Sequence, residues 1–105
     1  DYIYVKDVAD GYLFLLERIH SLAGEAFNFS SNDTHSVVKL IEIAEKSLGV
    51  KISYKIVNTA KNEIPYQHLN FDKIQKLGWI PMYDLQKSLF LTHTWYHRHK
   101  SLLFP

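Results

Sequence analysis

Residues 36–57 decide the fold that the sequence predicts, and they read SVVKLIEIAEKSLGVKISYKIV. In the first part, apolar residues recur at helical spacing behind Ser36, a favourable N-cap, and Gly49 follows where a helix commonly ends. Residues 51–57 alternate instead, with apolar side chains at the even positions, which is typical of a strand with one solvated face. A helix followed by a strand favours an α/β layer structure.

The flanking sequence extends this alternation in both directions. Residues 2–5 and 26–30 are rich in aromatic and β-branched residues and predict strands, and Asp7 is placed to cap a helix that continues to about Leu22. A polar loop at 58–65 is followed by a brief helix at 71–77, which Asn70 would cap, and a last helix starts at Asp84. We therefore expect the order β-α-β-α-β-loop-α-α, in one small alternating strand/helix α/β domain over residues 1–105.

Composition excludes several classes of protein. Twelve Lys and Arg against eleven Asp and Glu leave a formal net charge of +1, which disfavours a protein that binds nucleic acid through its phosphates. The absence of cysteine excludes disulfide scaffolds, thiolate metal sites and cysteine nucleophiles. No apolar run approaches the roughly 20 residues of a membrane-spanning helix. We expect neither nucleic acid nor a membrane as partner.

Common catalytic motifs are absent or explained by chance. The four glycines never approach the spacing of a dinucleotide-binding or phosphate-binding loop. The spacing Tyr-x-x-x-Lys, which pairs a phenol with an ammonium for proton transfer, occurs at Tyr2/Lys6, Tyr83/Lys87 and Tyr96/Lys100. None of the three is accompanied by a cofactor loop, so we interpret all of them as structural and expect no catalytic residue in this chain.

The histidines near the end of the chain have two possible interpretations, a metal site and a solvated helix end, and the second is favoured. His93 and His97 lie four apart on a helix, with His99 close by, so two imidazoles could supply part of a zinc site. No acidic residue lies between or after them, and histidine is favoured at the negative end of a helix dipole. We expect no metal.

Two polar residues are candidates for ligand contacts. Asn28 lies between Phe27 and Phe29, so its amide either meets the backbone or faces a ligand groove. Glu63, in the polar loop, could accept hydrogen bonds from a ribose or other hydroxyl, although loop glutamates are usually solvated.

Five blocks of the chain, taken in order, resemble a single enzyme family. They are residues 1–8 (DYIYVKDV), 27–30 (FNFS), 36–40 (SVVKL), 72–81 (DKIQKLGWIP) and 85–96 (LQKSLFLTHTWY). Together they resemble the C-terminal, substrate-binding portion of a Rossmann-type extended short-chain dehydrogenase/reductase, of the NAD-dependent nucleotide-sugar epimerase/dehydratase family. Within it, residues 63–69 (EIPYQHL) are most similar to CDP-glucose 4,6-dehydratases.

The resemblance implies a division of labour within a longer, cytoplasmic enzyme. An upstream half would hold NAD or NADP and carry the catalytic Tyr and Lys, so this fragment would bind no cofactor tightly. Here Asn28 would contact the nucleotide side of the substrate and Glu63 the ribose. The family's arginine for the pyrophosphate falls on Ala60 or Thr59, which leaves Lys61 as the nearest cation and a point charge in place of a two-pronged fork.

The resemblance also implies partners, and it leaves alternatives. We expect weak nucleotide-sugar binding by the isolated chain, an N-terminal cofactor domain as its natural neighbour, and self-association through exposed apolar surface. The alternatives are a stand-alone α/β module that binds a protein through its aromatic surface, and zinc binding through the three histidines of the last helix.

Overall fold

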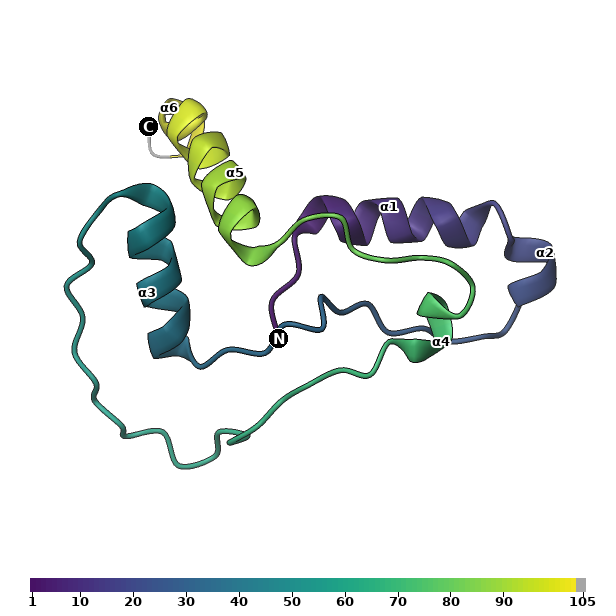
Figure 1. The fold of residues 1–105 in the computed structure, drawn as a ribbon, viewed down its shortest axis with the longest axis horizontal. Coiled ribbons are helices and arrows are strands. Elements are labelled where there is room, and N and C mark those ends of the chain that lie inside the picture. Colours follow the sequence, from purple (N-terminus) through teal and green to yellow (C-terminus); the bar gives the residue numbers. More distant parts are fainter. Residues whose placement is uncertain (104–105) are drawn as a thin grey trace.

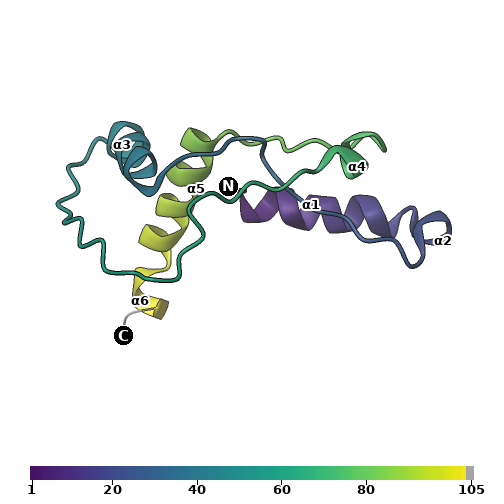
Figure 2. The same ribbon diagram turned by 90° about the horizontal axis from the view of Figure 1, so that it is seen from below.

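A computed structural model describes residues 1–103, and within them the chain is entirely helical and irregular (Figure 1). The helices are α1 (Val5–Leu16), α2 (Ile19–Leu22), α3 (Val37–Leu48), α4 (Asp72–Gln75), α5 (Leu85–Arg98) and α6 (Lys100–Leu103). The molecule is elongated, 49 × 36 × 25 Å, with α1, α2 and α4 at one end and α3, α5 and α6 at the other (Figures 1 and 2). No helix of this part is long and apolar enough to span a membrane.

The prediction of an alternating α/β domain is wrong. Residues 1–4, 26–30 and 51–57 are not helical, but no segment within 1–103 pairs with them in a ladder. An alternating pattern specifies which side chains share a face, whereas a strand requires hydrogen bonds from a second segment. These stretches therefore run as single segments without a paired neighbour, residues 1–4 ahead of α1 and the other two between helices.

The two longest predicted helices downstream are confirmed, together with their caps. The Ser36 side chain accepts a hydrogen bond from Lys39 N at 3.2 Å at the start of α3, and Gly49 ends that helix with a φ of 66°. The left-handed conformation at Gly49 is open to glycine without a steric cost, which explains the stop. At α5 the Asp84 carboxylate accepts from Lys87 N at 2.7 Å.

Helix α1 begins three residues earlier than expected, at Val5 with Tyr4 as its N-cap, and ends sooner. Asp7 lies in its first turn and caps nothing locally. Instead its buried carboxylate, 2% exposed, accepts from Met82 N at 2.8 Å and from Tyr83 N at 3.3 Å. At the other end, the Arg18 guanidinium donates to Phe14 O at 2.8 Å, and the short α2 continues at an angle.

The apolar core is small and lies around α4. Its buried members are Phe71, Ile74 and Trp79. Phe29 meets Trp79 edge-on with ring centroids 5.1 Å apart, and Phe71 meets it from another side at 6.2 Å. The remaining contacts come from Ile3, Phe14, Leu15 and Phe27. This arrangement joins the N-terminal half of the chain to the segment beyond residue 70.

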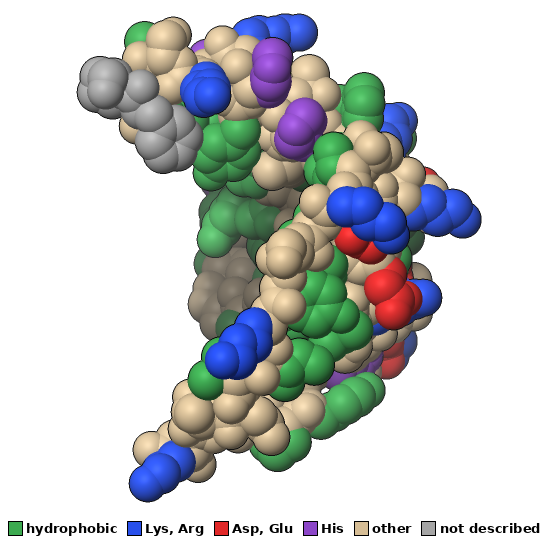
Figure 3. Space-filling view, turned by 90° about the vertical axis from the view of Figure 1, so that its left-hand side faces the viewer, with side chains coloured by type: hydrophobic (Ala, Val, Ile, Leu, Met, Phe, Trp, Pro, Cys, Tyr) green, Lys and Arg blue, Asp and Glu red, His purple; other side chains and the backbone are tan. Residues whose placement is uncertain are grey.

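Helices α3 and α5 pack against each other at the opposite end, beside a long outer loop. Residues 51–70 between α3 and α4 are exposed throughout and run outside the helices (Figures 1 and 2). Seen from this end, the surface is hollowed, and hydrophobic side chains show in the hollow (Figure 3). Basic side chains lie along the segment of chain that passes in front of it. The packing leaves large apolar side chains at the surface, among them Ile56, Ile64 and Tyr66.

Candidate functional site

Three non-helical segments, residues 1–4, 26–35 and 66–70, converge on the Asp1 carboxylate. Its Oδ2 accepts from Ser30 Oγ at 2.7 Å and from Leu69 N at 3.1 Å, while Ser31 Oγ donates to Tyr2 O at 2.7 Å. Ser30 is completely buried. Short hydroxyl and carboxylate side chains replace the missing ladder bonds here by bonding to neighbouring backbone. The result is a compact polar cluster built from distant parts of the sequence.

Asn28 lies at the margin of this cluster. Its Nδ2 donates to Asn70 O at 3.1 Å, so of the two possibilities left open by the sequence the amide meets the backbone. Phe27 and Phe29, its neighbours, point the other way into the core. The Asn28 side chain is exposed, and its Oδ1 forms no hydrogen bond within residues 1–103. That oxygen can accept a hydrogen bond from a ligand.

A second tether joins the same segments. Thr34 Oγ1 lies 2.8 Å from His68 Nδ1, and His35 Nε2 lies 2.7 Å from Asp33 Oδ1. Between these pairs and Ser30, Asn32 adopts a left-handed φ of 59°, which Asn tolerates better than most residues. The downstream end of the outer loop is therefore held to residues 28–35.

Lys61 and Glu63 are not brought to Asn28. Both are exposed on the outer loop, where residues 53–66 form no hydrogen bond or ion pair with the rest of the described chain. Figure 1 shows this part of the loop well away from the segment that carries Asn28. The three predicted contact residues thus occupy two separate places.

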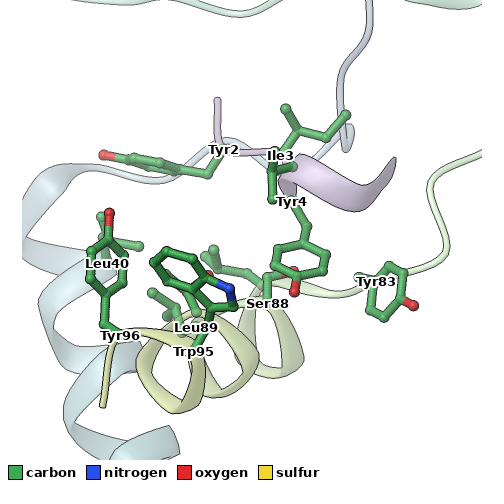
Figure 4. A pocket seen from close by; sticks show the side chains of 12 residues that line it. Tyr2, Ile3, Tyr4, Leu40, Tyr83, Ser88, Leu89, Trp95 and Tyr96 are labelled. Carbon is green, nitrogen blue, oxygen red and sulfur yellow. The ribbon is translucent and has the colours of Figure 1, made fainter. Parts of the chain in front are cut away.

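An apolar groove between the N-terminal segment, α3 and α5 was not anticipated from the sequence (Figure 4). Tyr2 and Tyr4 form one side of it, Leu89 and Trp95 of α5 the other, and Leu40 of α3 closes one end. Its volume, about 530 Å³, is in the range of small-molecule sites. The full lining is Tyr2, Ile3, Tyr4, Val5, Leu40, Tyr83, Leu85, Ser88, Leu89, Thr92, Trp95 and Tyr96.

The groove and the polar cluster share Tyr2, which lines the first and accepts a hydrogen bond in the second. Aromatic walls accommodate flat or weakly polar ring faces, and hydroxyl, amide and carboxylate groups pair with the polar edges of a ligand. The aromatic and β-branched composition of residues 2–5, which predicts a strand, is the sequence signal for this surface, and it supplies Tyr2 and Tyr4 to the groove instead. The arrangement is suited to binding and orientation.

The glycines and histidines of the described residues are placed as follows. Gly24, Gly49 and Gly78 have positive φ and all follow helices, so none opens a helix over a phosphate. The rings of His93 and His97 are 6.2 Å apart, but His99 stacks on a tryptophan of α5 instead of joining them. No three His, Asp or Glu side chains within residues 1–103 are grouped to hold a metal.

Tyr83 and Lys87, the Tyr-x-x-x-Lys pair at the start of α5, meet through the ring face of the tyrosine and not through its hydroxyl. Lys87 Nζ lies over the face of the Tyr83 ring, 5.1 Å from its centroid, as a cation–π contact.

Comparison with known proteins shows distant homology to sugar-nucleotide enzymes. No family model matches the chain. It is 31% identical over 97 residues to the UDP-glucose 4-epimerase of Haemophilus influenzae, covering 90% of this chain and 29% of that protein. It is 26% identical over 96 residues to probable GDP-L-fucose synthase 1 of Oryza sativa subsp. japonica, covering 91% and 29%. Human UDP-glucose 4-epimerase is 29% identical over 89 residues, covering 83% and 26%.

The chain therefore spans less than a third of the length of these curated relatives. At the level of distant homology, the likeness to the sugar epimerases of the extended short-chain dehydrogenase/reductase family is confirmed.

Proposed function

We propose that this chain, a distant homologue of UDP-glucose 4-epimerases and GDP-L-fucose synthases, is the substrate-side portion of an NAD(P)-dependent enzyme that modifies the sugar of a nucleoside diphosphate sugar. The observation that carries the proposal is the match to a UDP-glucose 4-epimerase, which runs through 97 residues at 31% identity. The likeness covers 90% of the chain. The groove and cluster support a role in binding.

The proposal assigns binding and orientation to these residues, and no redox step. The proposal assigns hydride chemistry to other parts of the enzyme, in keeping with the positions of Gly24, Gly49 and Gly78 after helices. Enzymes that use such cofactors gain rate from the protein by holding the substrate against the reactive atom. Residues that grip the nucleotide side of the substrate contribute in this way.

Asn28, Lys61 and Glu63 are the proposed substrate contacts. The free Oδ1 of Asn28 would accept from the base or ribose, Glu63 would accept from ribose hydroxyls, and Lys61 would offer its ammonium to the diphosphate. Because Lys61 and Glu63 lie on the exposed loop, their contribution requires the loop to approach the segment of Asn28 when substrate binds.

The product identifies the type of reaction. The relatives described above are epimerases and synthases, so the likeness of residues 63–69 to CDP-glucose 4,6-dehydratases stays a prediction that product analysis decides. A 4-epimerase returns the C4 epimer, a 4,6-dehydratase a 4-keto-6-deoxy sugar, and a GDP-L-fucose synthase GDP-L-fucose.

The test is turnover by the intact protein encoded by the complete reading frame, supplied with NAD or NADP and with UDP-, GDP- and CDP-linked sugars in turn. We expect one nucleotide class to be converted, and failure with all of them would refute the proposal. Glu63→Gln and Lys61→Ala should raise KM several-fold or more. Lys51→Ala, which removes a 94% exposed lysine from the same loop, is the matched control and should leave KM unchanged.

A further inference from the structure

The carboxylate of Asp1 joins two segments that are far apart in the sequence. Its Oδ2 accepts hydrogen bonds from Ser30 Oγ at 2.7 Å and from Leu69 N at 3.1 Å. Its Oδ1 is buried and has no hydrogen-bond partner within residues 1–103. All hydrogen bonds that this carboxylate accepts within the described residues therefore come from positions 30 and 69.

The two joined segments carry the Asn28 side chain and the carbonyl group to which it donates. Asn28 precedes Ser30 by two residues, and Asn70 directly follows Leu69. The hydrogen bond of 3.1 Å from Asn28 Nδ2 to Asn70 O therefore lies next to the bonds that Asp1 accepts. A carboxylate that holds positions 30 and 69 together also sets the separation between the Asn28 amide and its acceptor.

Each of the two segments also has a local anchor of its own. Ser30 is completely buried, and its Oγ accepts from Asn32 N at 3.1 Å. Asn70 Oδ1 accepts from Asp72 N at 3.0 Å, at the first residue of α4. Local anchors fix each segment internally, so what the Asp1 carboxylate restricts is the movement of one segment relative to the other.

The Asn28 amide depends on this restriction because its own hydrogen bond is weak support. The side chain is exposed, and water competes with Asn70 O for its donor, so that bond contributes little net free energy. The terminal torsion of an asparagine is also broad, which leaves the amide free to turn once its acceptor moves. A side chain that is already oriented loses less conformational entropy when a ligand binds.

We propose that Asp1 is a positioning residue for substrate binding, which acts through Ser30 and Leu69 to orient the Asn28 amide. The inference rests on the function proposed above, in which Asn28 Oδ1 accepts a hydrogen bond from the nucleotide side of a nucleoside diphosphate sugar. The hydrogen bonds of the Asp1 carboxylate go to protein groups, so it acts on the substrate only through Asn28. Its loss therefore weakens substrate binding and leaves the chemical step unchanged.

Steady-state kinetics of the intact protein test this role, with the nucleoside diphosphate sugar that it converts as the probe. Asn28→Ala should raise KM by about fivefold at unchanged kcat, as expected for the loss of one hydrogen bond. Asp1→Ala should also raise KM, by no more than that factor. The double variant should have the KM of Asn28→Ala alone, because two residues that act through one contact are not additive. Multiplied effects in the double variant, or an unchanged KM in Asp1→Ala, would overturn the proposal.

Two further variants separate positioning from stability. Asp1→Asn keeps one oxygen that can accept from Ser30 and Leu69, so KM should rise by a smaller factor than in Asp1→Ala, and that rise should also vanish in the Asn28→Ala background. If Asp1→Ala does not fold, this variant decides alone, and an effect that is absent or that persists without Asn28 counts against the proposal. Ser36→Ala is the matched control: it removes the N-cap bond of α3, lowers stability, and should leave KM unchanged.

The unsubstituted protein and Asn28→Ala together distinguish this inference from the proposed function. No turnover of any nucleoside diphosphate sugar by the unsubstituted protein would refute the proposed function, and the role of Asp1 with it. Turnover that proceeds with an unchanged KM in Asn28→Ala would refute the role of Asp1 and leave the proposed function standing.

Discussion

Replacement of Gly11 by alanine reverses the usual effect of that substitution in a helix. Gly11 lies in the interior of α1, where alanine is normally favoured by about 1 kcal/mol. A Cβ at this position would overlap the Phe29 ring, with Cδ1 and Cζ of the ring both at 2.9 Å and Cε1 closer still. Carbon atoms prefer separations of about 3.5–4.0 Å, so the ring would have to retreat by more than about half an ångström.

The ring has little room to retreat. Phe29 is packed edge-on against Trp79, with centroids 5.1 Å apart, and lies 5.6 Å from the Tyr12 ring. Overpacking of this kind costs about 1–3 kcal/mol, which exceeds the gain in helix propensity. We expect Gly11→Ala to lower the free energy of unfolding by about 1 kcal/mol, from the difference between the two effects.

Urea unfolding, followed by tryptophan fluorescence and by circular dichroism, measures this change. The matched control is the same substitution in a Phe29→Leu background, where the smaller side chain leaves room for the Cβ. There, Gly11→Ala should raise the unfolding midpoint, so that the two substitutions show a coupling of about 1–3 kcal/mol. A rise in the midpoint with Phe29 present, or no coupling between the two positions, would show that the close approach of α1 to that ring is wrong.

Three further outcomes are expected. Asp7→Asn should lower the free energy of unfolding in urea by about 2 kcal/mol, because a buried carboxylate that accepts two backbone N–H groups is lost, whereas Asp10→Asn on the exposed face should change it little. A hydrogen bond and the charge of Lys73 hold the pKa of Glu25 below its ordinary 4.5. The ionised form therefore stabilises the fold above that pH, and the contribution disappears as the pH falls through the folded pKa. An NMR titration of Lys73→Met should show the pKa of Glu25 raised, and an unchanged value would contradict the pairing. Addition of zinc should leave the melting temperature unchanged, since only two imidazoles of α5 face each other; a rise of several degrees would disprove this.

Helices could be predicted from the sequence wherever their determinants are local. Ser36, Gly49 and Asp84 act within one turn of their own position, and α3 and α5 begin or end where those residues indicate. Asp7 has the same residue type as Asp84, yet its carboxylate is used by the backbone at residues 82 and 83. Nothing in the local sequence distinguishes a cap from a long-range tether.

The lack of strands within residues 1–103, and the presence of the groove, could not be predicted for a related reason. An alternating stretch becomes a strand only if another segment supplies hydrogen bonds, and for residues 51–57 none within the described chain does so. The groove draws its walls from residues 2–5, from α3 and from α5, so its existence depends on how three distant segments pack. The position of Asn28 beside the backbone of Asn70 was one of two possibilities that the sequence allowed.

The outer loop is also a place where the chain can be cut into two fragments that still share a core. Residues 53–66 form no hydrogen bond or ion pair with the rest of residues 1–103, while the core joins Phe27 and Phe29, which precede the loop, to Phe71 and Trp79, which follow it. A single proteolytic nick within this stretch would leave two peptides, each carrying part of one aromatic cluster and one of the two packed helices α3 and α5. Such pieces are suited to fragment complementation, with their reassembly reported by whatever is fused at the new ends.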